Sequence, residues 1–353
     1  GIEKRVSDRF RAAAFLIRKT AWGEPMKTTI NLDGIYKLKR LDYGTDIGFV
    51  FREDFYPAGY LDIKVPGDVR TALREYGLID GYYLGKNLDK ERWIEESDWL
   101  YVRDFFCDLS LKDRENVLCF DGIDTLAEVW LNGKLLGKTD NMFLEQRFDA
   151  TDILRYGAYN TLAVKIISPV ESTKDVDRTG IYPEDDTTRM LLRKSQMNWG
   201  WDFCGHCLTG GIWKSVRIES RDCPVFETVH LRTVRLEGDR AVLAAGLKAK
   251  PYGKRGVNGL KAELLFSLEG NFVTRVEIPA DGTETEFPVK NPQLWWPRPY
   301  GKARLYNVTA ALLEDGKETD RRQFRFGIRT VVLHQEKDEF GGRQFQFEIN
   351  GRR

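Results

Sequence analysis

The chain has 353 residues, with 55 Lys and Arg against 54 Asp and Glu, so its formal net charge is only +1. A charge balance this even excludes a protein that binds nucleic acid mainly through a basic field. Apolar residues make up 42% of the chain and aromatic residues 12%, which is enough to fill the cores of two to three domains. No stretch approaches the roughly 20 consecutive apolar residues that cross a bilayer, so we expect no membrane partner.

The first 25 residues predict an N-terminal extension with a short amphipathic helix. Apolar residues recur at helical spacing from Phe10 to Ile17, behind Ser7 as a candidate N-cap. The first thirty residues carry charges throughout and contain no apolar signal core. Because the chain opens on Gly1 rather than Met, the compartment stays open.

From Met26 to residue 221 the sequence predicts a first domain of short strands, rich in aromatic and β-branched residues. The pair Asn132-Gly133 favours a type I′ turn, which predicts a hairpin over residues 126–137. One helix is expected at residues 68–76, with Asp68 at its N-terminus. The predicted strands cover residues 99–106, 117–120, 127–131, 161–167 and 212–218.

Residues 222–331 predict a second β domain, because stretches such as 241–249 and 260–268 also alternate in the manner of strands. Neither block alternates strands with long helices, so a parallel α/β sheet is excluded. The fold class is therefore all-β, a jelly-roll-like β-sandwich followed by an immunoglobulin-like β-sandwich. Residues 332–353 form a third, short unit, in which residues 344–349 predict a strand and Asn350-Gly351 a turn.

Five cysteines at irregular spacing are no disulfide framework. The run Cys204-Gly205-His206-Cys207 could begin a zinc site, but a structural zinc needs further ligands that only the fold could supply. We favour free thiols beside a surface histidine. No metal and no cofactor are predicted.

Both predicted domains contain distinctive motifs. The first domain has VPGD at residues 65–68, WLYVRDF at 99–105, FDGIDTLA at 120–127 and GGIWKSV at 210–216, and the second has PQLWWP at 292–297 and FGIRT at 326–330. Together these motifs resemble glycoside hydrolase family 2, and within it the β-mannosidases. Those of the first domain are similar to the family's N-terminal sugar-binding, galactose-binding-like domain, and those of the second to its immunoglobulin-like domain. The likeness runs from about Met26 to the last residue.

The resemblance implies a retaining glycosidase, in which two Glu residues on a TIM barrel cleave the bond through a covalent glycosyl intermediate. In the family that barrel follows a strand and turn like residues 345–351, so residues 332–353 are expected to lead into a barrel absent from this chain. The chain alone is then expected to be inactive. Its implied partners are a terminal β-mannoside or related β-glycoside and the barrel domain of the same protein, with a homodimer left open.

Local carboxylate pairs offer an alternative source of catalysis. They are Asp121 with Asp124, Glu95-Glu96 and Asp185-Asp186. Neighbouring carboxylates on a strand point to opposite faces, and those on loops are usually solvated. We therefore expect no catalytic residue in this chain.

The segment RKSQMNWGWDF at residues 193–203 resembles a β-mannosidase loop that reaches across the barrel mouth. By that resemblance Trp201 lines the sugar pocket and Asp202 accepts hydrogen bonds from sugar hydroxyls, while Arg193 supports the loop by pairing or by hydrogen bonds to backbone carbonyls. The plainer alternative makes Trp201 a packed loop aromatic and Asp202 a turn cap. The sequence departs from the family at Asn198-Trp199, Phe203 and residues 204–206, which bears on the sugar more than on the fold.

Asn87 lies in a stretch resembling a family loop, with Leu88 in place of a Glu. Its side chain either contacts sugar or, as we favour, fixes its own loop. Two other classes of function remain open, namely a carbohydrate-binding protein that stands alone and a purely structural pair of β domains. Within the family, β-galactosidase, β-glucuronidase and exo-β-glucosaminidase specificities are the alternatives.

Overall fold

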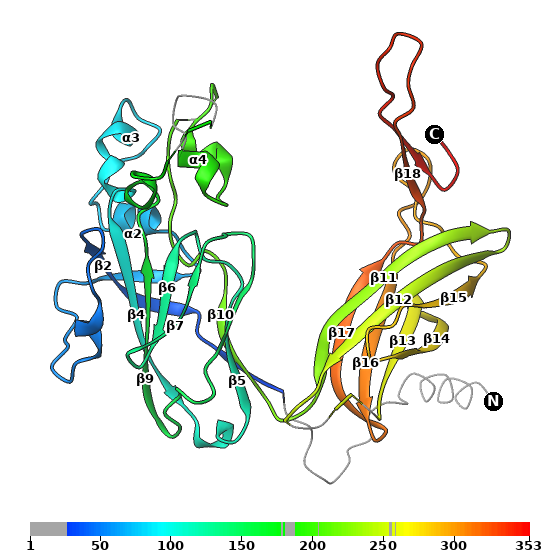
Figure 1. The fold of residues 1–353 in the computed structure, drawn as a ribbon, viewed down its shortest axis with the longest axis horizontal. Coiled ribbons are helices and arrows are strands. Elements are labelled where there is room, and N and C mark those ends of the chain that lie inside the picture. Colours follow the sequence, from blue (N-terminus) through cyan, green and yellow to red (C-terminus); the bar gives the residue numbers. More distant parts are fainter. Residues whose placement is uncertain (1–26, 178, 181–187, 204, 254–255, 258) are drawn as a thin grey trace, which may run out of the picture. The chain divides into compact units, whose positions relative to one another are not determined.

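The computed structural model describes residues 27–177, 179–180, 188–203, 205–253, 256–257 and 259–353 (Figure 1). The helix expected between Phe10 and Ile17 lies outside these residues. Contacts divide the described residues into two compact units, Thr28–Arg221 and a unit containing Asp222–Arg353. Among the described residues, no helix combines the length and the apolar character needed to cross a membrane.

The first unit is a sandwich of two antiparallel sheets. One sheet has six strands in the order β3-β2-β4-β9-β6-β7, and the other has four in the order β1-β10-β5-β8. The strands are β1 (Thr28–Asn31), β2 (Gly34–Leu41), β3 (Leu61–Val65), β4 (Asp98–Cys107), β5 (Glu115–Phe120), β6 (Ala127–Leu131), β7 (Lys134–Thr139), β8 (Gln146–Asp149), β9 (Ala158–Ile166) and β10 (Val216–Arg221).

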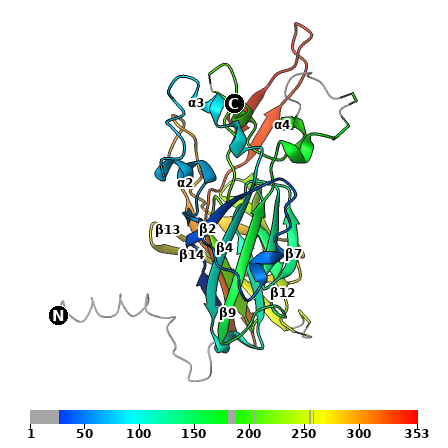
Figure 2. The same cartoon turned by 90° about the vertical axis from the view of Figure 1, so that its left-hand side faces the viewer.

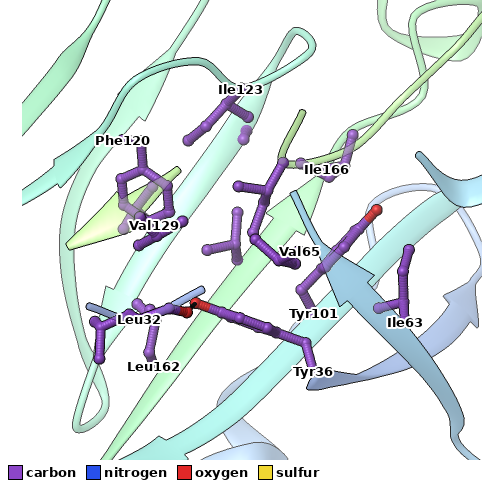
Figure 3. Packing of buried hydrophobic residues seen from close by; sticks show 14 of the residues in the cluster. Leu32, Tyr36, Ile63, Val65, Tyr101, Phe120, Ile123, Val129, Leu162 and Ile166 are labelled. Carbon is purple, nitrogen blue, oxygen red and sulfur yellow. Dashed lines mark hydrogen bonds between the residues drawn. The ribbon is translucent and has the colours of Figure 1, made fainter. Parts of the chain in front are cut away.

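The core of this unit forms because alternate residues of each strand face the opposite sheet. Figure 3 shows Phe120 of β5 near Val129 of β6, so that side chains of both sheets meet. Tyr36 and Tyr101 pack edge to face with ring centroids 6.5 Å apart, and the Tyr36 hydroxyl donates to the Leu32 carbonyl at 2.8 Å. Burial of these rings against both sheets supplies a large hydrophobic contribution to stability.

Helical segments gather largely at one end of the sandwich, where α2, α3 and α4 lie together in Figures 1 and 2. The predicted helix is confirmed as α2, whose N-cap Asp68 accepts hydrogen bonds from the Arg70 and Thr71 amides. The expectation of a single helix is wrong, because further short ones occur. The helical segments of this unit are α2 (Val69–Glu75), α3 (Asn87–Lys90), α4 (Thr188–Leu191), η1 (Gly48–Phe51), η2 (Arg92–Ile94), η3 (Leu109–Leu111), η4 (Glu171–Thr173) and η5 (Gln196–Trp199).

The predicted hairpin is confirmed, since β6 and β7 are joined by Asn132 and Gly133, both with positive φ. The strand expected at residues 212–218 is wrong at its start, because β10 begins only at Val216. Before that point the chain makes single contacts instead of a ladder. Gly211 bridges to Asp124, and the Ile212 carbonyl accepts the Gly67 amide at 2.9 Å.

The second unit is the expected two-sheet, immunoglobulin-like sandwich. Its sheets have the orders β11-β12-β15 and β14-β13-β16-β17, and the core between them includes Phe226, Leu264, Phe266 and Tyr306. A separate hairpin pairs β18 with β19. The strands are β11 (Val225–Glu237), β12 (Arg240–Lys250), β13 (Leu260–Leu268), β14 (Asn271–Pro279), β15 (Thr285–Lys290), β16 (Tyr306–Glu314), β17 (Lys317–Phe326), β18 (Val331–His334) and β19 (Gln346–Ile349).

Candidate functional site

The loop that carries Trp201 and Asp202 joins α4 to β10, at the end of the first sandwich where the helices gather (Figure 1). Its single turn η5 ends at Gly200, whose φ of +96° suits glycine alone among the residues. Trp199, the last residue of η5, is 6% exposed and packs against Leu192 and Leu208. Trp201, on the other side of Gly200, is 59% exposed. Gly200 therefore separates a buried tryptophan from an exposed one.

Trp201 and Asp202 are open to solvent. The Arg189 guanidinium lies 5.6 Å from the centroid of the Trp201 ring, within the range of a cation–π contact. Asp202 is exposed, as is the next residue, Phe203. An exposed aromatic ring and an exposed carboxylate on consecutive residues suit a pyranose, which offers an apolar face to a ring and hydroxyl donors to a carboxylate.

The base of this loop is closed by a buried ion pair between Lys194 and Asp124. The Lys194 ammonium also donates to the Thr209 carbonyl oxygen at 2.7 Å and to the Thr209 hydroxyl at 3.3 Å. The Thr209 hydroxyl in turn donates to the second carboxylate oxygen of Asp124 at 2.6 Å. Burial lowers the pKa of Lys194, and the neighbouring carboxylate opposes that shift.

The returning arm of the loop is also attached to α2. Arg70 donates from Nε to the Leu208 carbonyl at 2.8 Å and from Nη1 to Glu91 Oε2 at 3.0 Å. Asp68 accepts the Gly210 amide at 2.9 Å, and burial raises the pKa of this carboxyl although backbone amides donate to it. The helix predicted from the sequence thus supports the loop as well as the sheet.

Arg193 has a side chain that is 70% exposed, with Nη1 4.0 Å from Asp140 Oδ2. Its backbone carbonyl accepts the Met142 amide at 3.1 Å. A contact this exposed contributes little to stability. The cation that holds the loop base is the next residue, Lys194. It stands in the segment RKSQMNWGWDF, but no sequence pattern marks it as a buried ion-pair partner.

Asn87 lies at the start of α3 and donates from Nδ2 to the Gly81 carbonyl at 3.0 Å. Its Oδ1 accepts from Lys90 at 3.4 Å. These contacts match the loop-fixing role favoured above. The α3 turn is nevertheless a neighbour of the candidate site, because a Cβ built on Gly205 would lie 2.7 Å from Leu88 Cδ1.

Of the described carboxylates considered as catalytic pairs, Asp121, Asp124 and Glu95 contact basic side chains, and Glu96 is exposed. Asp121 pairs with Arg217, and Asp124 pairs with Lys194. Glu95 contacts Arg92 at 3.1 Å and His206 at 2.8 Å. Asp185-Asp186, like Cys204, lies outside the described residues.

Comparison with known proteins places these two domains in a family. A family model described as "Glycosyl hydrolase 2 galactose-binding domain-like" matches residues 49–214, and one described as "Glycosyl hydrolases family 2" matches residues 247–329. Beta-mannosidase B of Emericella nidulans is 31% identical over 318 residues, which cover 86% of this chain and 37% of that protein.

Solved structures agree with this assignment. The crystal structure of beta-D-mannosidase from Dictyoglomus thermophilum has a TM-score of 0.77 and 30% identity, and the likeness covers 92% of this chain and 39% of that one. A beta-glucuronidase of Bifidobacterium dentium shares the fold, with a TM-score of 0.64 at 20% identity over 94% of this chain and 51% of that chain. This chain therefore spans less than two fifths of the curated relative, and with its galactose-binding-like and immunoglobulin-like domains it belongs to glycoside hydrolase family 2.

Proposed function

We propose that this chain is the N-terminal, non-catalytic part of a β-mannosidase-like retaining glycosidase. In this proposal its first domain completes the subsite for the terminal sugar. The observation that carries the proposal is the 30–31% identity to two β-mannosidases over 86–92% of the chain. The similarity to β-glucuronidases is 20% or less in identity and supports only the fold.

Trp201 and Asp202 are the residues that we propose contact the sugar. The Trp201 ring covers the apolar face of the pyranose, and the Asp202 carboxylate accepts hydrogen bonds from two hydroxyls. A charged acceptor of this kind discriminates against sugars that lack a matching donor, because the carboxylate is then left unpaired in the closed site. Both side chains are exposed on a loop whose ends are held by buried contacts, which suits a group that must meet a substrate from outside its own domain.

The cleavage itself is proposed to occur on a TIM barrel that follows residue 353. One Glu there attacks the anomeric carbon while another protonates the departing glycosidic oxygen, and water then hydrolyses the glycosyl-enzyme with the second Glu acting as base. The β18–β19 hairpin favours the proposal of a further domain, because it exposes apolar side chains of the kind that are usually buried against another surface. Among them are Val331 at 52%, Leu333 at 39%, Phe345 at 72% and Phe347 at 53% exposure.

The test is an assay of the full-length gene product on a panel of aryl β-glycosides. We expect kcat/KM to be highest on the β-mannoside, and lower on the β-galactoside, β-glucuronide and β-glucosaminide. A product that cleaves none of them, or prefers another member of the panel, contradicts the proposal. If the gene ends at residue 353 and the chain binds mannosides without cleaving them, the catalytic part of the proposal is wrong and a stand-alone binding protein replaces it.

A further inference from the structure

We propose that Lys194 is a positioning residue of the sugar site, whose ammonium closes the base of the loop carrying Trp201 and Asp202. The effect on catalysis rests on the proposed function. The contacts of Lys194 with Asp124 and Thr209, which we call the clamp, are present in this chain regardless of that function. Lys194 and Thr209 stand at the two ends of residues 195–208, and Trp201 and Asp202 lie near the middle of that span. A contact between the ends therefore restricts the arms of the loop that adjoin Lys194 and Thr209.

The ammonium uses all its donors on this contact. A lysine has three N–H groups, and those of Lys194 reach Asp124 Oδ1, the Thr209 carbonyl at 2.7 Å and the Thr209 hydroxyl at 3.3 Å. The side chains of Lys194 and Asp124 are 1% and 3% exposed, so water does not compete for these bonds. A planar guanidinium presents its donors in a fork and does not reproduce this arrangement.

Thr209 links the clamp to the interior of the loop. Its hydroxyl accepts from Asn198 Nδ2 at 2.9 Å while it donates to Asp124. The Asn198 carbonyl accepts the Cys207 amide at 2.8 Å, which ties the outgoing arm to the returning arm. One continuous set of hydrogen bonds thus runs from the buried ion pair to within three residues of Trp201.

A buried ion pair is a poor source of net stability, because desolvation of the two charges offsets much of their attraction. What such a pair does provide is a single geometry, since neither partner has another favourable arrangement in the interior. A sugar subsite requires its contacting groups to be held within about 0.5 Å of the productive position. We infer that positioning, and not stability alone, is the role of this pair.

The matched pair of variants is Lys194→Met and Lys165→Met. Lys165 is also buried and ion-paired in the same domain, with Nζ 3.5 Å from Glu128 Oε2 and 3.2 Å from the Thr45 carbonyl. Because its contacts lie away from the loop, Lys165→Met reports the general cost of removing a buried lysine. Thr209→Val keeps the ion pair and removes only the bridging hydroxyl, so it serves where Lys194→Met does not fold.

Two measurements test the proposal. The first is hydrogen exchange of the Cys207 amide in the 353-residue chain, which we expect to quicken at least tenfold in Lys194→Met or Thr209→Val, relative to core amides and to Lys165→Met. The second is kcat/KM on an aryl β-mannoside in the full-length enzyme, which we expect to fall at least tenfold in the same variants. We propose that Lys194 acts by positioning Asp202. The fold-decrease in kcat/KM of the double variant Lys194→Met with Asp202→Ala should therefore be smaller than the product of the fold-decreases of the two single variants.

Unchanged exchange at Cys207 overturns the clamp. The positioning role is overturned if the decreases in kcat/KM of Lys194→Met and Asp202→Ala multiply fully in the double variant. It is also overturned if the kcat/KM of Lys194→Met is no lower than that of Lys165→Met. If Asp202→Ala alone leaves kcat/KM unchanged, the proposed sugar contact fails instead, and the exchange measurement still decides whether the clamp orders the loop.

Discussion

At the scale of single residues, the packing around Gly211, next to the Lys194–Asp124 ion pair, is unusually close. Gly211 bridges to Asp124 where the returning arm of the loop enters the sandwich. A Cβ on this glycine would lie 2.5 Å from the Tyr101 hydroxyl and 2.8 Å from the Gly67 carbonyl, and its φ is +150°. Backbone and side chain are therefore close-packed beside the clamp, where a single methyl group has no space.

Gly211→Ala tests this close packing. We expect the first domain to lose about 2–4 kcal/mol of unfolding free energy, from overpacking together with an unfavourable backbone conformation. Gly44→Ala is the control, because its φ is +79° but no atom lies within 4 Å of the added Cβ, so it should cost only about 1 kcal/mol. Denaturant unfolding of both variants gives the comparison, and equal losses would show that crowding at Gly211 is unimportant.

At the scale of elements, the sequence predicts features that depend on neighbouring residues, such as turns and helix starts. It does not predict contacts between residues that are far apart in the chain. Asn132-Gly133 and Asp68 each mark a turn or a helix start through nearby backbone geometry, so the sequence predicts the β6–β7 hairpin and α2. The turns α3 and α4 have four residues each, which is too short for a helical period to appear. The clamp joins Asp124, Lys194 and Thr209, which are far apart in the chain, so no local pattern reveals it.

The β18–β19 hairpin carries a pH-dependent contact. Hydrogen bonds from His334 to Glu336 and Glu348, at 3.0 and 3.1 Å, raise the pKa of this histidine above its usual 6.5. A raised pKa means that the protonated ring stabilises the hairpin fully below pH 6.5 and loses this effect as the pH rises through the folded-state pKa.

An NMR titration of the His334 ring, with exchange of the hairpin amides, checks this expectation. The ring should titrate above 6.5, and amide protection should fall on the alkaline side of its midpoint. Glu348→Gln should move the midpoint down, since it removes one of the two carboxylates. A midpoint at or below 6.5 in the unchanged chain would contradict the assignment.

At the scale of the whole molecule, the chain has two β sandwiches, with a candidate sugar-contacting loop in the first unit and an apolar hairpin in the second. The sequence predicted the fold class, because alternating strands and turn residues are read locally and the family motifs span both domains. Trp201 and Asp202 could be predicted only from the resemblance to the family, because their exposure on a loop with fixed ends is a property of the folded chain. The contribution of these residues to catalysis belongs to the longer protein that we propose.

The most direct test of this account is kcat/KM of Asp202→Ala on an aryl β-mannoside in the full-length enzyme, with Asp54→Ala as an exposed aspartate outside the site. We predict a loss of roughly 100-fold for Asp202→Ala, equivalent to about 2.7 kcal/mol of transition-state stabilisation, because sugar hydroxyls lose a charged acceptor. Asp54→Ala should match the wild type. A kcat/KM for Asp202→Ala within about twofold of the wild type would contradict the claim that this domain completes the sugar subsite.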